Sequence, residues 1–286
     1  MTAFAAPASA VGTTHYVSPF PSAGADLSCD LPGFNTIQMA VDVSAPGDTI
    51  VVCPGVYQEQ VRVYRSLTLT GSNATIKAPA VLTGPTPNTR NIVDVFGATS
   101  TTPVDVVMSG FIVSGPGPGP CGSIDSGIGV RDGATLDLSY TTVRDVRDQP
   151  FSGCQNGEGI RVGTPRNESA TPQIGHAVID HVVVTRYQKN GITVAGPGST
   201  AKITNSTTTG MGKTTVIAQN GVQVSSGATA TVNNNVIRDN YYTPKGTVAC
   251  GLLIFNASGV TESENTYQGN EQNKCTVSGR GGNFQE

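Results

Sequence analysis

The segment Gly159-Ile-Arg-Val162 is one copy of a short motif, glycine, aliphatic, any residue, aliphatic, that repeats along the chain. The other copies begin at Gly127, Gly191, Gly221 and Gly251, so that successive copies follow in steps of 32, 32, 30 and 30. A second marker follows a similar period. It consists of three asparagines spaced 30 apart, namely Asn205, Asn235 and Asn265. Two markers with a common period in the range of about 20 to 50 residues indicate a repeat architecture.

The repeating unit contains strands and no helix. Its apolar residues alternate with period two, and Val, Ile and Thr predominate between the markers. Repeats that need a helix are thereby excluded. The pattern predicts a parallel β-helix, in which Ile160 and Val162 point inward and stack on Ile192 and Val194 of the next turn about 4.8 Å away. A β-propeller is the alternative, but the chain has no Trp and only 6% aromatic residues.

Composition supports an all-β fold. The chain has 286 residues, of which 13% are charged, and it contains 35 Gly and 18 Pro. A helical bundle needs more charged residues and fewer of these helix-breaking residues, so it is excluded. Hydrophobic residues make up 37%, which is enough to bury a core, so disorder is not expected. The net charge is -3 without a basic stripe, which argues against nucleic-acid binding.

Six cysteines form three successive pairs without any CxxC spacing: Cys29 with Cys53, Cys121 with Cys154, and Cys250 with Cys275. Each pair is separated by about one coil, so we expect three disulfides in this order and an oxidising compartment. Six free thiols in a cytosolic protein are the alternative. Residues 1–10 resemble the end of a signal peptide, which favours secretion. The sequence contains no apolar run long enough to cross a membrane, so a membrane span is not expected.

Three regions are expected along the chain. Residues 1–12 are a signal-peptide remnant or a disordered start. Residues 13–48 form an N-terminal cap, in which segment 34–45 places Phe34, Ile37, Ala40 and Val41 on one face of a short amphipathic helix. Such a helix would cover the apolar end of the coil. Residues 49–286 form the β-helix itself.

Between Ile37 and Gly71 the chain reads IQxAVDxxxPGDTIVVxPGVYxExVxV, followed by SLTLxG. This pattern resembles the first turn of the right-handed parallel β-helix superfamily that includes pectate lyases and pectin methylesterases. The resemblance implies a right-handed, single-stranded coil with a short capping helix. Segment Gly55–Glu59 fits the opening GxYxE of the methylesterases, but their later motifs are absent, as are those of the polygalacturonases. The resemblance therefore implies a fold and leaves the activity open.

Charge is concentrated in one part of the coil, where 14 of the 37 charged residues lie between Arg131 and Lys189. We expect Arg161 in an outward slot and Arg131 on the neighbouring turn, so that the two guanidinium groups could bind a carboxylate of a uronate sugar. An outward Arg161 would contribute little to stability. The expected catalytic residues are Glu158, Arg161, Arg186 and Lys189, and the expected substrate-binding residues are Arg131, Asp145, Asp148 and Tyr187. A solvated, mutually paired surface is the alternative.

Calcium is the one cofactor that the sequence suggests. The pectate lyases carry a Trp-Ile-Asp-His segment whose aspartate binds calcium, and this chain has Ile179-Asp180-His181 without the Trp. The resemblance thus implies Asp180 as a candidate ligand, with an ordinary corner residue as the alternative.

Together these features predict a secreted β-helix protein that acts on polysaccharide, with lyase chemistry on an acidic, uronate-containing glycan as its most specific form. Such a protein would have a polysaccharide or cell-wall glycan as its partner, and neither nucleic acid nor a membrane span is expected. The alternatives are a non-catalytic coat, surface or carbohydrate-binding module and a stable repeat protein without further activity.

Overall fold

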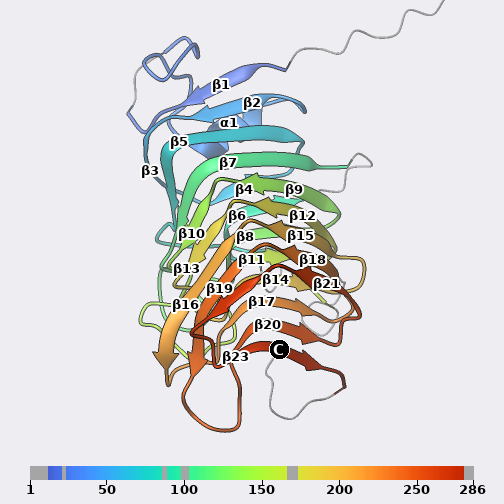
Figure 1. Ribbon diagram of the computed structural model, residues 1–286. Coiled ribbons are helices and arrows are strands. Elements are labelled where there is room, and N and C mark those ends of the chain that lie inside the picture. The colour runs from blue at the N-terminus through green and yellow to red at the C-terminus, as the bar shows by residue number, and fades with distance from the viewer. Residues whose placement is uncertain (1–11, 21–23, 86–88, 98–102, 166–172, 280–286) are drawn as a thin grey trace, which may run out of the picture.

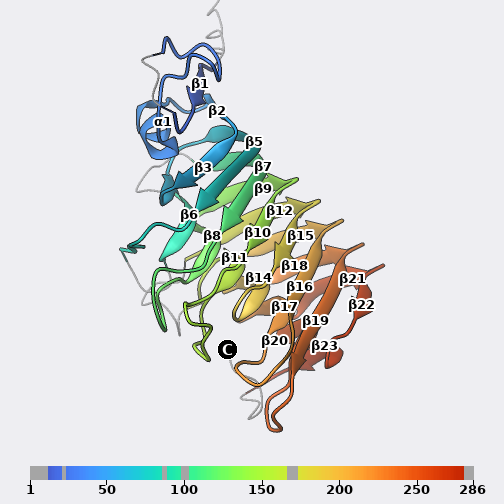
Figure 2. The ribbon, with the colours of Figure 1, turned by 90° about the vertical axis from the view of Figure 1, so that its left-hand side faces the viewer.

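A computed structural model describes the chain except for residues 1–11, 21–23, 86–88, 98–102, 166–172 and 280–286. It is a right-handed parallel β-helix, as expected, in which successive turns of the chain stack as rungs from the N-terminal to the C-terminal end (Figures 1 and 2). The expected segment 1–12 lies almost entirely outside the described residues. No helix in the described part of the chain has the length and apolar character needed to cross a membrane.

The strands form a large sheet of 15 strands and a small sheet of eight, and the strands within each sheet pair in parallel. The large sheet begins with β1 (Thr14–Val17), β2 (Thr49–Val52), β3 (Gly55–Gln58), β5 (Leu67–Lys77) and β7 (Asp105–Ser114). Beyond the long strand β7 it divides into two arms. The first arm contains β9 (Ala134–Ser139), β12 (Gly175–Asp180), β15 (Thr200–Thr204), β18 (Thr229–Asn233) and β21 (Gly259–Ser263). The second arm contains β10 (Thr142–Arg144), β13 (Val183–Thr185), β16 (Thr207–Thr214), β19 (Val236–Tyr242) and β22 (Thr266–Gln268).

The small sheet carries the repeated glycine motif. It contains β4 (Val61–Val63), β6 (Asn91–Phe96), β8 (Ser126–Arg131), β11 (Glu158–Val162), β14 (Asn190–Ala195), β17 (Asn220–Ser225), β20 (Cys250–Phe255) and β23 (Gln272–Val277). The register pairs Ile160 with Ile192, Ile192 with Val222, and Val222 with Leu252, all of which are fully buried. The aliphatic ladder predicted from the period of the glycine motif is thus confirmed.

The N-terminal end of the coil is covered by helix α1 (Ile37–Val43), which buries Ile37, Ala40 and Val41. The helix is shorter than the expected segment 34–45 because the side chain of Thr36 caps its first turn by accepting a hydrogen bond from the backbone of Met39. Phe34 lies in extended backbone that bridges to Val17 rather than on the helix.

The GxYxE segment stabilises this end of the coil. Glu59 accepts hydrogen bonds from the backbone N–H groups of Ile37 and Gln38, at 2.9 and 3.0 Å, which satisfies two donors at the start of α1. Tyr57 is buried and donates its hydroxyl to the carbonyls of Val17 and Cys53. The residues shared with the methylesterases therefore have structural roles here.

Only two of the three asparagines of the second marker stack on each other. Asn235 and Asn265 occupy equivalent corners on neighbouring rungs, and the Asn235 side chain donates to Asn265 Oδ1 at 3.0 Å. Ser206, not Asn205, takes the equivalent corner on the preceding rung and donates its backbone N–H to Asn235 Oδ1. The expected equivalence of Asn205 is wrong by one position because Thr207 pairs with Val236, a step of 29 rather than 30.

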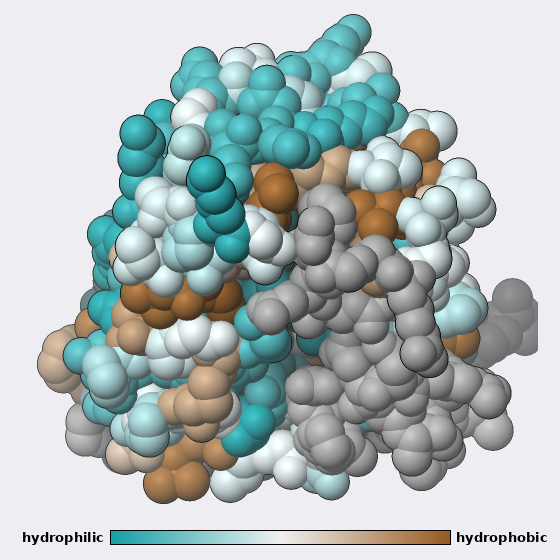
Figure 3. Space-filling model, turned by 90° about the horizontal axis from the view of Figure 1, so that it is seen from below, coloured by the Kyte–Doolittle hydropathy of each residue, from teal (hydrophilic) through white to brown (hydrophobic). Residues whose placement is uncertain are grey.

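The three expected disulfides are present, Cys29–Cys53, Cys121–Cys154 and Cys250–Cys275. The third joins β20 and β23 near the C-terminal end of the coil, where the surface mixes hydrophobic and hydrophilic side chains (Figure 3). Side chains in the last rung are more exposed than those above, since the described chain adds no further rung. There, Glu262 accepts hydrogen bonds from Lys274, Asn265 and Tyr267.

Candidate functional site

Polar side chains follow the outer face of the small sheet, and they are buried. Strands β8, β14, β17 and β20 have every residue buried, so both faces of the sheet are covered along these four strands. Two columns of polar residues run across the strands in register. The first column contains Asn91, Ser126, Glu158, Asn190 and Asn220, and the second contains Asp94, Arg161, Thr193 and Gln223.

Arg131, at the end of β8, binds a carboxylate from the preceding rung. Its Nε and Nη2 atoms donate to the two oxygens of Asp94 at 3.1 and 2.8 Å, and it also pairs with Asp132. Burial lowers the pKa of Arg131, but the hydrogen bonds and the negative charges of Asp94 and Asp132 together raise it above its ordinary value. The Arg131 guanidinium lies 4.5 Å from the centre of the Phe96 ring, which is only partly buried.

Glu158 and Arg161 form a second ion pair within β11, 3.1 Å apart. Glu158 Oε1 also accepts hydrogen bonds from Asn190 at 3.1 Å and from Thr193 at 2.8 Å. Lys189 precedes β14 and is 2% exposed. Burial lowers the pKa of Lys189 to about 8, although the charge of Glu158 acts in the opposite direction. We call Asp94, Arg131, Glu158, Arg161 and Lys189 the buried ionic cluster.

The cluster differs from the expected arrangement in two ways. Arg161 pairs in register with Gly129 and Thr193, whereas Arg131 pairs with Phe96, so the two guanidinium groups do not stack on neighbouring rungs. Each has its own carboxylate. The expectation of exposed side chains is also wrong, because Arg131 and Arg161 are only 7% and 8% exposed. The alternative of a solvated, paired surface is wrong for Arg131 and Arg161 for the same reason.

An aromatic row leads from the cluster toward solvent. Tyr64, Phe96 and Arg131 occupy equivalent positions on three successive rungs, one residue beyond paired valines. The rings of Tyr64 and Phe96 lie 6.1 Å apart, and the guanidinium of Arg65 lies 4.6 Å from the Tyr64 ring. Tyr64, Arg65 and Phe96 are all partly exposed. This row gives the otherwise buried cluster an accessible edge.

Asp145 and Arg186 follow strands of another sheet, directly after β10 and β13 of the second arm. Arg186 Nε donates to Asp145 Oδ1 at 2.7 Å, and the Arg186 side chain is 53% exposed. The hydrogen bond from Arg186 to Asp145 raises the pKa of Arg186. The structure thus gives these two expected site residues a surface ion pair with each other.

Asp148 and Tyr187 are fully buried, contrary to the expectation of substrate-binding side chains. Tyr187 donates its hydroxyl to Asn240 at 2.5 Å and fills the core between rungs, because its ring faces inward. Asp148 accepts hydrogen bonds from Ser123, Ser152 and Gln188, which tie two loops together.

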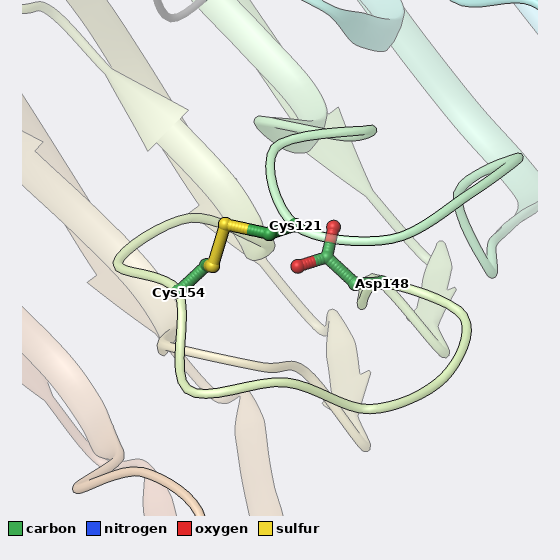
Figure 4. A group of neighbouring side chains, drawn as sticks. All are labelled: Cys121, Asp148 and Cys154. Atoms are coloured by element: carbon green, nitrogen blue, oxygen red, sulfur yellow. A yellow bond between two sulfur atoms is a disulfide. The ribbon is translucent and has the colours of Figure 1, made fainter.

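Asp148 also belongs to the one group of three potential metal-ligating side chains found among the described residues. Its partners there are Cys121 and Cys154, whose sulfurs are joined as a disulfide (Figure 4). A disulfide provides no thiolate, so this group does not fit a metal ion. The carboxylate of Asp180, the other candidate, accepts hydrogen bonds from Thr204, Asn205 and His181. These bonds lower the pKa of Asp180 to about 2, and they give it a corner role.

The sequence reasoning missed most of the polar columns and the aromatic row. A signal for the columns was present in the motif itself, which reads Asn190-Gly-Ile-Thr193 and Asn220-Gly-Val-Gln223. In these two copies the residue before the glycine and the residue between the two aliphatics both face outward, and both are polar. Nothing in the local sequence indicated that Tyr64 and Phe96, which are distant along the chain, would lie on neighbouring rungs beside Arg131.

No protein-family model matches the chain, and no curated protein matches it in sequence. Solved structures do match. XylC, solved in a complex with xylose, is 14% identical with a TM-score of 0.62, and the match covers 93% of this chain and 64% of XylC. Pectate lyase Pel9A is 14% identical with a TM-score of 0.51, covering 90% of this chain and 79% of Pel9A. The chain thus spans less than two thirds of XylC. At such identities the likeness concerns the fold alone, and the fold that the chain shares with these proteins is the right-handed parallel β-helix.

Proposed function

We propose that the protein is secreted and acts on polysaccharide, at the outer face of the small sheet where the aromatic row meets the buried ionic cluster. The observation that carries this proposal is the stacking of Arg131 on Phe96, with Tyr64 on the next rung. Aromatic faces bind the apolar faces of sugar rings, and guanidinium groups bind carboxylates. A uronate sugar carries both features. Secretion is supported by the three disulfides, which persist in oxidising compartments.

Lyase chemistry is the most specific form of the proposal. In β-elimination a base removes the proton beside the uronate carboxyl group, the bond from the adjacent carbon to the glycosidic oxygen breaks, and that oxygen gains a proton from water. A carbon–carbon double bond remains in the product. Lys189 suits the role of base because burial lowers its pKa to about 8, so part of it is uncharged near neutral pH. Arg131, which lies beside the partly exposed ring of Phe96, would hold the carboxylate of the substrate.

Replacing Lys189 tests the role of the base. Lys189→Met keeps the length of the side chain and removes the amine, so turnover of a uronate polymer should fall about 100-fold or more. The wild-type rate should rise toward pH 8 as the amine loses its proton. Lys245→Met, an exposed lysine in the loop before β20, is the matched control and should leave turnover unchanged. Wild-type turnover by a folded Lys189→Met variant would exclude Lys189 as the base.

A non-catalytic carbohydrate-binding module is the second candidate. Arg131 and Arg161 are already paired with carboxylates, and the residues of the cluster are at most 8% exposed, which favours a structural role for them. The two candidates differ in their products. Binding of uronate oligosaccharides without new absorbance from an unsaturated product would favour the module, whereas such absorbance would favour the enzyme.

A further inference from the structure

The first arm of the large sheet carries an open groove on its outer face. Two adjoining hollows, of about 540 and 600 Å³, share the side chains of Val178 and Lys202. They extend across β9, β12, β15, β18 and β21, the five strands stacked along the coil axis in Figure 2. With a rung spacing of about 4.8 Å, the groove follows the axis for roughly 19 Å. Hollows of this size are typical of ligand sites.

The floor of the groove presents polar side chains, mostly threonines, together with one exposed valine. Thr135, His176, Thr200 and Thr229 are in register on four successive rungs, and His176 Nδ1 lies 2.8 Å from Thr200 Oγ1. Val178 also points outward, is 38% exposed and lines the groove, whereas the alanines between the outward positions, Ala177, Ala201 and Ala230, face the core of the coil. Sugar rings have apolar C–H faces and hydroxyl rims, so this floor can meet both.

One end of the groove presents an exposed pair of rings. Tyr140 is 68% exposed and lines the groove, and its ring stacks on that of His181 with the centres 5.1 Å apart and the planes 24° apart. Both residues occupy the corner that follows the first arm, where the next two rungs have Asn205 and Asn234 instead. An exposed large aromatic side chain beside a hollow is a feature of ligand-binding surfaces.

The charges of the groove select against an acidic ligand. Asp137, Asp180 and Glu264 line it together with one cation, Lys202. Asp180 stays ionised at all ordinary pH values because Thr204, His181 and Asn205 hydrogen-bond to it and lower its pKa to about 2. A polyanion would therefore meet three carboxylates and one ammonium group. An uncharged chain of sugars would not be repelled.

We propose that the groove on the first arm binds an uncharged polysaccharide, whose chain lies along the coil axis with one sugar ring stacked on Tyr140. This site is separate from the small sheet and does not depend on the proposed function. A protein with both sites would hold a neutral glycan on one face and an acidic glycan on another.

The experiment measures binding of hexasaccharides derived from xylan, β-glucan and mannan, by titration calorimetry, with a polygalacturonate hexasaccharide as the acidic probe. At least one neutral hexasaccharide should bind the wild-type protein, and Tyr140→Ala should weaken that binding about tenfold or more through loss of the stacking surface. The matched control is Tyr241→Ala, a partly exposed tyrosine on β19 of the second arm, which should bind as the wild type does. Melting temperatures of both variants should equal that of the wild type.

The proposal is overturned if none of the neutral hexasaccharides binds, if Tyr140→Ala binds them as well as the wild type does, or if Tyr140→Ala weakens only the acidic probe. It is also overturned if the wild type forms a dimer that Tyr140→Ala dissociates, because the face would then be an interface between two copies. Formation of unsaturated product from uronate polymers, measured in parallel, depends on the small sheet. A result that overturns the proposal for the groove can therefore be distinguished from a result that overturns the proposed function.

Discussion

Arg161 and Glu158 form an ion pair in which both residues are less than 9% exposed. Removing charges from water costs several kcal/mol per ion, and mutual attraction with good hydrogen bonds compensates for it. Glu158 has such bonds from Asn190 and Thr193. Single residues of this cluster therefore contribute to stability as well as to any chemistry, unlike exposed residues such as Arg186.

We expect Arg161→Ala to reduce the free energy of unfolding by about 3 to 5 kcal/mol, since it leaves Glu158 buried without this partner. Arg186→Ala, which breaks an exposed pair with Asp145, should cost at most about 1 kcal/mol. Urea denaturation of both variants measures the difference. Equal, small losses in the two variants would mean that the small-sheet face is open to water in solution.

Lys189 should make stability depend on pH. Its pKa is lowered from 10.5 in the unfolded chain to about 8 in the folded protein, so between these values the unfolded state binds more protons. Stability contributed by this group therefore rises as the pH increases from 8 toward 10. The free energy of unfolding of the wild type, relative to that of Lys189→Met, should increase over pH 8 to 9.5. A constant difference between the two proteins would show that Lys189 is accessible to water.

At the scale of elements, the cap on the N-terminal end depends on a contact between segments that are distant in the sequence. Helix α1 has only seven residues and no acidic side chain in its first turn, so it would be marginal alone. Glu59, which follows β3, supplies the acceptors for its first N–H groups. The pKa of Glu59 is raised by its burial, and the two backbone hydrogen bonds partly offset this.

Glu59→Ala should destabilise the protein by about 1 to 3 kcal/mol, because two backbone donors lose a charged acceptor. The neighbouring variant Gln58→Ala removes an exposed side chain of β3 and should change stability by less than about 0.5 kcal/mol. Thermal unfolding followed by circular dichroism compares the two. The assigned cap would be refuted by a Glu59→Ala variant as stable as Gln58→Ala.

The strand stack could be predicted from sequence because the nearly constant period of the glycine motif places Ile160, Ile192 and Val222 in line. The disulfides followed because each pair is about one coil apart. The site could not be predicted as well. Whether the outward slot of Arg161 faces solvent depends on what covers the sheet, and the motif contains no information about that. The pairing of Arg131 with Asp94 depends on the register between two strands that are distant along the chain.

At the scale of the whole molecule, two faces of one coil have different characters. The small sheet has a buried ionic cluster with an aromatic edge, and the first arm of the large sheet has an open, net acidic groove. Because each rung repeats every face, a β-helix extends such surfaces along its axis as rungs are added. The two proposed carbohydrate sites are consequences of this geometry.

The central claim is that the small sheet acts on an acidic polysaccharide. The most direct measurement is incubation of the wild-type protein with a set of uronate polymers, including polygalacturonate and alginate, while ultraviolet absorbance is followed for an unsaturated product. The account predicts that absorbance increases with at least one polymer, and that it increases faster as the pH approaches 8. The claim would be contradicted if absorbance increased with none of the polymers in the set.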